Sequence, residues 1–228
     1  MNKIVILHGW TYSNEKWSEL INLLQQESRT VLIPPIPGLS GSIMNKPWEL
    51  NDYIIWLEEQ LMNEDTIILI GHSNGGRIAT RFAAKHPNKI EKLILIDTAG
   101  LIRKEKLYIL KKKFFEHLSK VGKKLTSSTY LEKLLYKLVG ESDYHQAEPQ
   151  MKATMLNLIS TDLIEDFKKL TIPTLIIWGG DDTITPIYQA EEIHTLIPQS
   201  KLYIVKNARH SPFYTDAQEV FNSIKSFI

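Results

Sequence analysis

Six short aliphatic runs constrain the fold of this chain more than any other feature of its sequence. They are KIVIL (3–7), TVLI (30–33), TIILI (66–70), KLILI (92–96), TLIIW (174–178) and KLYIV (201–205). Each is rich in Ile, Leu and Val and does not alternate with polar residues, which is typical of strands buried on both faces of a parallel sheet. Apolar residues with helical spacing lie between the runs, as in 17–24 and 220–227. This alternation predicts a doubly wound, mostly parallel α/β sheet of six strands.

One interval breaks the alternation. No strand-like run occurs between about residues 101 and 169, where the leucine spacing instead indicates amphipathic helices. Two are expected within 107–121 and 131–138, and a third at 149–159. A helical insertion between two parallel strands lies over their carboxyl edge, where such sheets bind ligands. We therefore expect a core formed by 1–100 and 166–228, and a helical cap formed by 101–165.

The composition excludes several classes of protein. The chain has 228 residues, of which 43% are hydrophobic and 23% charged, as in ordinary soluble globular proteins. Its net charge of +1 gives no overall bias toward nucleic acid, and the absence of cysteine removes thiolate metal sites and a cysteine nucleophile. The N-terminus has too few apolar residues for a signal peptide, and no apolar run approaches the roughly 20 residues of a membrane span. We expect a cytoplasmic protein with no nucleic-acid partner and no membrane span.

Charge is nevertheless concentrated in one segment. Residues 101–140 hold eleven Lys or Arg against three acids, a net charge of +8. Such a block either docks an acidic carrier protein or an anionic ligand, or forms a solvated outer face of helices. Lysines outnumber arginines ten to one here, whereas recognition of phosphate or carboxylate usually favours arginine. The solvated face is therefore the simpler interpretation.

A glycine-rich corner at 71–76, GHSNGG, holds the chain's strongest chemical signal. It follows the aliphatic run 66–70 and precedes a helical segment that begins near Asn74. Glycines at 71 and 75 let strand, turn and helix approach closely, so that Ser73 can take a strained conformation that exposes its hydroxyl. The N-terminus of a helix also favours developing negative charge. These are the requirements of a nucleophile.

The corner resembles the nucleophile elbow of the α/β-hydrolases, in which an acid and then a histidine follow the serine along the chain. WGGDDTITP, after the fifth run, resembles the acid loop of that family, and counting from Gly179 places the acid at Asp182. Asp181 is a competitor, and Asp97, after the fourth run, is a weaker one. NARHSPF, after the last run, resembles the histidine loop and implies His210 as the general base.

Other parts of the resemblance concern the oxyanion and the pocket. HGW, at 8–10, lies where the family has an oxyanion-hole amide, which implies the backbone N–H groups of Trp10 and Asn74 as donors. We also expect Trp10 and Phe213 to contact substrate. His72 is expected to be structural, because adjacent strand and turn residues point apart.

Two departures from the family stand out. The family usually has two strands before the one that carries HG, and this chain starts directly on that strand. The usual D-x-P-G-x-G-x-S segment appears as IPPIPGLSGS, without its aspartate and with its glycine displaced by one. The second departure concerns the pocket entrance rather than the triad.

The resemblance implies a serine esterase, similar to carboxylesterases, that cleaves small-molecule esters through an acyl-enzyme on Ser73 without a cofactor or a metal. Alternatives with the same triad are a carbon–carbon bond hydrolase, a lactonase and a methyl esterase of acyl-carrier conjugates, and also a cofactor-free lyase or perhydrolase. A non-catalytic alternative is a ligand-binding scaffold of the same fold.

Overall fold

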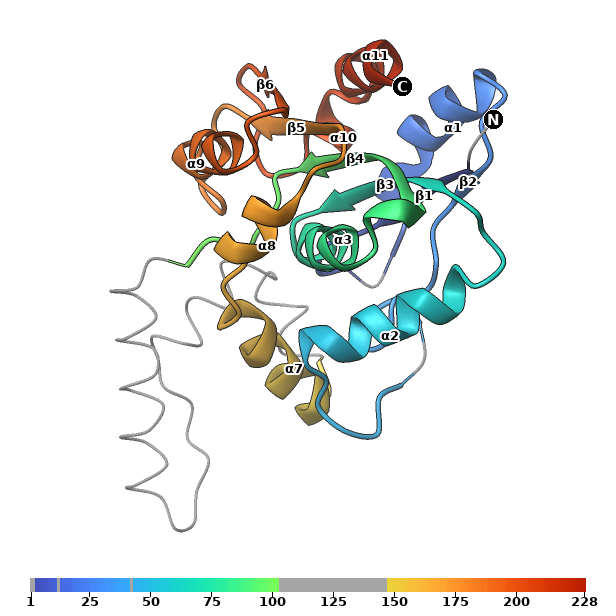
Figure 1. The fold of residues 1–228 in the computed structure, drawn as a ribbon, viewed down its shortest axis with the longest axis vertical. Coiled ribbons are helices and arrows are strands. Elements are labelled where there is room, and N and C mark those ends of the chain that lie inside the picture. Colours follow the sequence, from blue (N-terminus) through green and yellow to red (C-terminus); the bar gives the residue numbers. More distant parts are fainter. Residues whose placement is uncertain (1–2, 12, 42, 103–146) are drawn as a thin grey trace.

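The computed structural model describes residues 3–11, 13–41, 43–102 and 147–228, and its centre is one six-stranded sheet. All five strand pairs are parallel, in the order β2-β1-β3-β4-β5-β6 (Figure 1). The strands are β1 (Lys3–Leu7), β2 (Val31–Leu32), β3 (Ile67–His72), β4 (Ile90–Ile96), β5 (Thr174–Gly179) and β6 (Lys201–Val205). The predicted six-stranded α/β sheet is confirmed.

The strand order identifies where a ligand would bind. From β1 the chain moves outward to β2, then returns to the other side of β1 and builds β3 to β6 in sequence. The direction of winding therefore switches between β1 and β3. In open α/β sheets, ligands bind outside the carboxyl ends of the strands at such a switch point. The two segments that follow these strands contain His8–Gly9–Trp10 and Ser73.

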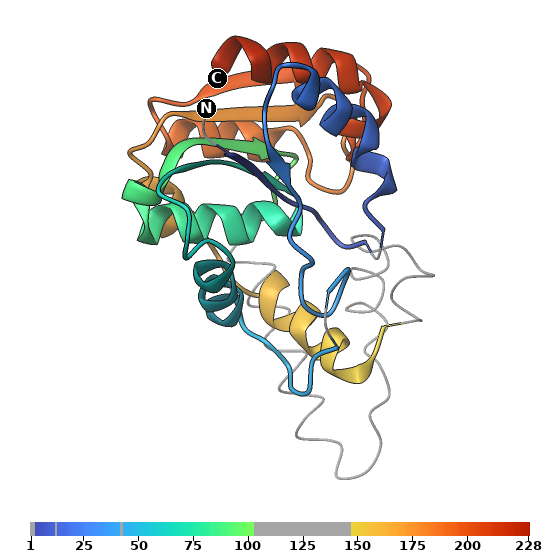
Figure 2. The same cartoon turned by 90° about the vertical axis from the view of Figure 1, so that its right-hand side faces the viewer.

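Helices cover both faces of the sheet (Figure 2). Those described are α1 (Ser18–Gln26), α2 (Leu50–Gln60), α3 (Asn74–Lys85), α7 (Pro149–Ile159), α8 (Ile164–Lys169), α9 (Tyr188–Leu196), α10 (Pro212–Thr215) and α11 (Ala217–Phe227), with 3-10 turns at Glu15–Trp17 and Pro87–Lys89. α1, α10 and α11 pack on one face, and the other face is covered by α3, α8 and α9, with α2 and α7 in the same apolar cluster.

Alternation along the strands divides the core between these two faces. In β1, Ile4 and Ile6 join the cluster under α1 and α11, whereas Val5 and Leu7 join the cluster under α3. The same period of two holds in β3, β4 and β5, because successive side chains of a strand point to opposite faces. Both faces are apolar, which explains why the sequence of these strands does not alternate with polar residues.

The two edge strands depart from the expectation of burial on both faces. β2 has only two residues, and both are half-buried. In β6, Lys201 and Tyr203 are exposed while Leu202 and Ile204 are half-buried. An edge strand has a neighbour on one side only, so helices cover it less completely.

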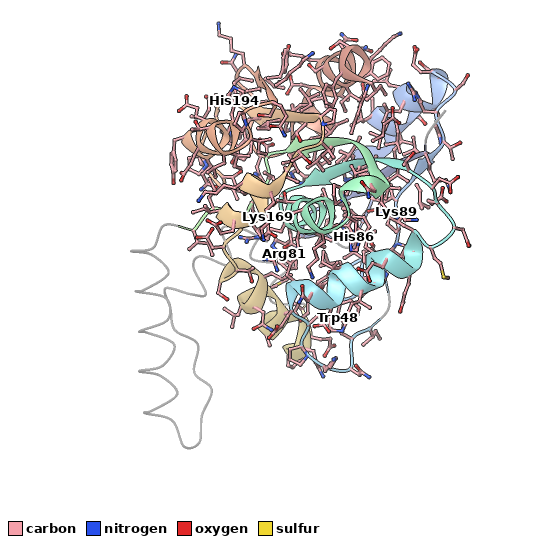
Figure 3. The ribbon with its side chains drawn as sticks, viewed as in Figure 1. Trp48, Arg81, His86, Lys89, Lys169 and His194 are labelled. Carbon is pink, nitrogen blue, oxygen red and sulfur yellow. The ribbon has the colours of Figure 1, made fainter. Side chains whose placement is uncertain are left out.

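Residues 101–102 and 147–165 of the expected cap are described, and they include α7, whose bounds agree with the predicted helix at 149–159. Its Thr154 Oγ1 accepts a hydrogen bond from the Trp48 backbone N–H at 2.7 Å, and Asn157 Nδ2 donates to the Trp48 carbonyl at 3.1 Å. Figure 3 shows Trp48 at the end of α2 nearest α7. The helix is thereby attached to the segment that leads into α2. The two other predicted cap helices, and most of the basic segment 101–140, lie outside the described residues.

An ion pair joins α3 to α8. Arg81 Nε lies 2.9 Å from Asp166 Oδ1, and Figure 3 shows Arg81 on the side of α3 that faces α8. Arg77, one turn earlier on α3, donates from Nη1 to the Thr161 carbonyl at 2.9 Å. These contacts fix α3 against the segment that returns to the core. None of the helices in the described ranges has both the length and the apolar character required to cross a membrane.

Candidate active site

Ser73 occupies a sharp corner between β3 and α3. Its backbone has φ 51° and ψ −114°, a conformation that non-glycine residues rarely adopt. Two hydrogen bonds to the end of β4 hold it there: Ser73 N–H donates to the Ile96 carbonyl at 3.2 Å, and Ala99 N–H donates to the Ser73 carbonyl at 3.1 Å. The strained elbow expected from the sequence is present, and neighbouring strand ends stabilise it.

Close packing at Gly75 allows this corner to form. A Cβ atom at that position would lie 2.5 Å from the carbonyl carbon of Leu7 and 2.6 Å from the carbonyl oxygen of His8. Real Cβ atoms essentially never approach backbone this closely. Only glycine therefore allows the first turn of α3 to pack against the end of β1, which brings Ser73 beside the His8–Trp10 segment.

His210 lies after β6 and reaches Ser73 from the other side of the site. Its Nε2 is 2.9 Å from Ser73 Oγ, and its Nδ1 is 2.7 Å from Asp182 Oδ2. A carboxylate only accepts hydrogen bonds, so Nδ1 carries the proton and Nε2 is free to accept from the serine hydroxyl. The three predicted triad residues form one hydrogen-bonded chain in the orientation that general-base activation of a serine requires.

Asp182, rather than Asp181, contacts the histidine. Asp182 Oδ1 accepts from the backbone N–H groups of Ile184 at 2.7 Å and Thr185 at 3.0 Å, and its Oδ2 accepts from Thr185 Oγ1 at 2.6 Å. Burial pushes the pKa of the Asp182 carboxyl upward, but the hydrogen bonds from His210, Thr185 and Ile184 outweigh it, and the pKa lies below its ordinary value. The Asp181 side chain is exposed to solvent.

Sequence reasoning did not identify Thr185 as part of the site. Its hydroxyl lies 2.6 Å from Asp182 Oδ2 and 3.3 Å from His210 Nδ1, so it contacts both residues of the Asp182–His210 pair. The spacing Asp-x-x-Thr was a possible signal, because an Asp side chain often accepts from backbone and hydroxyl groups two and three residues later.

A second carboxyl group, Asp97, lies after β4 and is fully buried. Its Oδ1 accepts from the Gly179 N–H at 2.8 Å, whereas its Oδ2 has no hydrogen-bond partner within the described part of the chain. Burial, and then the charge of Asp182, raise the pKa of Asp97 well above its ordinary value. Asp97 is therefore harder to ionise than Asp182, and it is Asp182 that accepts the hydrogen bond donated by His210 Nδ1.

His72 contacts His210 and does not contact the serine hydroxyl. Its Nε2 lies 2.8 Å from the His210 carbonyl oxygen, so Nε2 carries a proton and donates. Burial is the largest of the effects that lower the pKa of His72, to about 3, so the ring is neutral near pH 7. One ring nitrogen each of His72 and His210 and a carboxylate oxygen of Asp97 lie within 4.8 Å of one another. Both nitrogens of His210 are already engaged by Asp182 and Ser73, so this group is a poor cation site.

Phe213 packs against the His72 ring. Its ring stacks on Trp17 with centroids 3.7 Å apart and meets His72 edge-on at 4.7 Å. Only 3% of Phe213 is exposed, so packing accounts for most of its surface. Contact of Phe213 with substrate stays a prediction.

The segments that carry the two expected oxyanion donors both adjoin Ser73. Asn74 is the first residue of α3, where backbone N–H groups have no partner inside the helix. The Trp10 segment approaches from β1: a Cβ atom at Gly9 would lie 3.1 Å from Ser73 Cβ. Among the described residues, neither the Trp10 nor the Asn74 backbone N–H has an acceptor. Trp10 itself is half-buried and packs against the core under α3.

Known proteins with the same architecture are numerous. A pimeloyl-(acyl-carrier protein) methyl ester esterase of Legionella pneumophila (strain Paris) is 27% identical over 242 residues, which cover 99% of this chain and 94% of the relative. The structure of a thermophilic esterase from Thermogutta terrifontis matches with a TM-score of 0.75 at 22% identity, covering 99% of this chain and 89% of that one. A bromoperoxidase from Bacillus anthracis matches with a TM-score of 0.76 at 23% identity, covering 100% and 92%.

A model of one protein family, described as the alpha/beta hydrolase fold, matches residues 2–217, which is nearly the whole chain. The architecture, the switch point and the elbow agree with that match. This chain belongs to the α/β hydrolase fold family.

Proposed function

We propose that this protein hydrolyses carboxylic esters through a covalent acyl-enzyme on Ser73. The observation that carries the proposal is the unbroken hydrogen-bonded chain from Asp182 through His210 to Ser73. A serine hydroxyl is a weak nucleophile until a base accepts its proton, and that base needs a group that fixes its tautomer. Here both requirements are met by side chains from three separate loops.

In the first half of the reaction, His210 Nε2 takes the proton of Ser73 as Oγ attacks the ester carbonyl carbon. The carbonyl oxygen becomes an anion, and the Trp10 and Asn74 N–H groups are proposed to stabilise it. Removal of one oxyanion donor in other serine hydrolases costs about 10²–10³ in rate. The tetrahedral intermediate then collapses: the bond to the alkoxy group breaks, and protonated His210 gives its proton to the departing alcohol.

In the second half, water replaces the alcohol. His210 takes a proton from water, the hydroxide attacks the acyl carbon, and the bond to Ser73 Oγ breaks as His210 returns the proton to the serine. Asp182 stays ionised throughout and stabilises the imidazolium that forms in each half. The lowered pKa of Asp182 suits this role, because the group must remain charged while its neighbour gains and loses a proton.

Hydrolysis of p-nitrophenyl esters from acetate to decanoate tests this proposal. We expect turnover by the wild type, none above background by Ser73→Ala, and a severe loss in Asp182→Asn. Asp181→Asn is the matched control, since it changes the adjacent exposed aspartate, and it should stay close to wild type. A folded wild type that is inert across the whole series would contradict the esterase proposal. It would favour the carbon–carbon hydrolase, the lyase or the ligand-binding scaffold instead.

A narrower candidate is a methyl esterase that acts on acyl groups attached to a carrier protein. Two observations favour it: the Legionella relative is a methyl ester esterase of an acyl-carrier conjugate, and residues 101–140 carry a charge of +8, which would suit an acidic carrier. In this proposal residues 101–165 form the cap on which the carrier docks. The test compares kcat/KM for one methyl ester, free and carrier-linked, at low and high salt. A preference for the carrier-linked ester that salt removes would support docking, and equal rates would exclude it.

The cellular location belongs to the proposal as well. We propose the cytoplasm as that location. Fractionation of cells that produce the protein with its natural N-terminus would test this expectation.

A further inference from the structure

The strongest unexplained group of polar residues near the site lies behind the oxyanion segment. His8 is fully buried, and both of its ring nitrogens are engaged: Nδ1 lies 2.8 Å from the Gly9 carbonyl oxygen, and Nε2 lies 2.7 Å from Ser40 Oγ. The mechanism described above uses neither His8 nor Ser40. A buried polar pair at this position needs an explanation, because burying polar groups is costly unless they are hydrogen-bonded.

The proton positions in this group follow from its acceptors. The Gly9 carbonyl can only accept, so Nδ1 of His8 carries the proton and donates to it. Burial lowers the pKa of His8, so the ring is neutral and its Nε2 has a free lone pair. The Ser40 hydroxyl therefore donates to Nε2, and its oxygen accepts from the Ile36 N–H at 3.1 Å. The result is a directed chain from Ile36 through Ser40 and His8 to the Gly9 carbonyl.

Ser40 is held in a fixed place at the start of this chain. The Leu39 and Gly41 N–H groups both donate to the Ile36 carbonyl, at 3.0 and 2.9 Å, which closes the turn around Ser40. Gly41 cannot carry a side chain, since a Cβ atom there would lie 2.8 Å from the Pro35 carbonyl carbon. The displacement of the motif glycine by one position, noted in the sequence, thus places a hydroxyl-bearing residue beside His8.

The anchored carbonyl determines where the next amide points. In a trans peptide, C=O and N–H point in opposite directions from the same plane. Holding the Gly9 carbonyl against His8 therefore directs the Trp10 N–H to the other side of that peptide. Gly9 itself packs closely against Ser73, since a Cβ atom added to Gly9 would lie 3.1 Å from Ser73 Cβ.

We propose that Ser40 and His8 are positioning residues that orient the Gly9–Trp10 peptide so that the Trp10 N–H faces the oxyanion. This inference rests on the proposed ester hydrolysis, and it adds that Ser40 acts on the rate without touching substrate. Loss of the Ser40 hydroxyl frees the His8 ring to rotate and releases the Gly9 carbonyl. The Trp10 N–H then spends only part of its time in the productive orientation.

The test compares Ser40→Ala with Ser13→Ala. Ser13 lies in the segment that follows Trp10, between β1 and α1, where its Oγ accepts a hydrogen bond from the Glu15 N–H at 3.2 Å in an exposed position. For Ser40→Ala we expect kcat per titrated active site to fall by about tenfold or more. Complete removal of an oxyanion donor costs about 10²–10³ in rate, and a misplaced donor should cause part of that loss. KM should change by less than about twofold, because the oxyanion exists only in the transition state. Ser13→Ala should match wild type.

A transition-state analogue separates positioning from a general structural role. A trifluoromethyl ketone adds to Ser73 and places an oxyanion in the hole, so its affinity should weaken in Ser40→Ala by the same factor as kcat/KM. Ser40→Thr restores a hydroxyl and should recover part of the lost rate. Equal inhibitor affinity and equal kcat per active site in Ser40→Ala and wild type would overturn the inference while leaving the esterase proposal intact.

A crystallographic comparison tests the inference independently of activity. We expect the Gly9 carbonyl to lie against His8 in wild type and to turn away in Ser40→Ala. An unchanged Gly9–Trp10 peptide in the variant would overturn the inference whether or not the protein proves to be an esterase. If the wild type is inactive and the Gly9–Trp10 peptide turns away in the variant, the esterase proposal is contradicted while the positioning role of Ser40 is supported.

Discussion

Asp97 and Asp182 are close enough for the charge of Asp182 to raise the pKa of Asp97, yet only Asp182 hydrogen-bonds to His210, at 2.7 Å. The two carboxyl groups follow neighbouring strands of the sheet, and each is a plausible acid by sequence position. Their surroundings shift their pKa values in opposite directions. Asp182 accepts hydrogen bonds on both oxygens, which favours its charged form, whereas Asp97 is buried and accepts one from the Gly179 N–H, which leaves its neutral form favoured.

Replacement of Asp97 by asparagine should therefore leave catalysis nearly unchanged. The amide is neutral, like the protonated form that the raised pKa of Asp97 favours, keeps an oxygen for the Gly179 N–H, and tolerates the backbone φ of 42° at this position. We expect kcat/KM of Asp97→Asn within about threefold of wild type, against a loss on the order of 10³–10⁴ for Asp182→Asn. Steady-state kinetics on one p-nitrophenyl ester measures both. The reverse ranking would make Asp97 the acid partner of His210.

Asp97 should also give stability a recognisable pH dependence. Its pKa in the folded chain lies above the ordinary value of 3.8. At pH values between these two pKa values, the folded protein therefore binds more protons than the unfolded chain. Stability consequently falls as pH rises through that window. Asp97→Asn lacks this loss, so its Tm relative to wild type should increase from pH 4 toward pH 8. Asp182 has a lowered pKa and contributes the opposite trend, but it is present in both proteins, so its contribution cancels in the Tm difference. A Tm difference that does not change with pH would contradict this prediction.

His72 should affect the rate without affecting its pH dependence. Its hydrogen bond to the His210 carbonyl holds the histidine loop, and one such bond contributes about 0.5–1.5 kcal/mol. His72→Phe keeps an aromatic ring beside Phe213 and removes the donor, so we expect kcat to fall by up to about tenfold. His72→Gln, which can still donate, should lose less. Because the pKa of His72 is lowered to about 3, the pH–rate profiles of all three proteins should have the same shape above pH 5. A displaced profile would show that His72 titrates in the working range.

Gly75 should be far less tolerant of a methyl group than Gly180. A Cβ atom at Gly75 would lie 2.5 Å from the Leu7 carbonyl carbon, whereas a Cβ atom at Gly180 would find its nearest neighbour at 3.5 Å. We expect Gly75→Ala to lower the free energy of unfolding by about 1–3 kcal/mol or more, since backbone has to move. Gly180→Ala should change it by no more than about 0.5 kcal/mol. Urea unfolding followed by circular dichroism measures both, and equal stabilities would mean that α3 does not pack on β1 as described.

The sequence allowed the sheet and the loops of the site to be predicted because both are local signals. Continuous aliphatic runs mark strands buried on two faces, and the residues just after them must lie at the carboxyl edge. The choice of Asp182 over Asp181 likewise depended on spacing from a glycine, and the structure places Asp182 against His210.

The supporting contacts could not be predicted in this way. The hydrogen bond from His72 to the His210 carbonyl joins residues 138 positions apart, and the bond between His8 and Ser40 spans 32. Such pairs depend on how the strands are ordered in the sheet, which periodicity does not specify. The exposed side of β6 was missed for the same reason, because an aliphatic run does not reveal that its strand lies at an edge.

Covalent trapping tests the central claim most directly. Wild type and Ser73→Ala are incubated with diethyl p-nitrophenyl phosphate. An activated serine attacks its phosphorus, p-nitrophenolate leaves, and the diethylphosphoryl group that remains on the serine is hydrolysed very slowly. Intact mass and peptide mapping then locate the label, and residual ester hydrolysis is measured in parallel. The account predicts one diethylphosphoryl group per wild-type chain, on Ser73, with activity lost in proportion to labelling and no label on Ser73→Ala. Complete inactivation with the label on another residue, or full ester hydrolysis by Ser73→Ala, would contradict it.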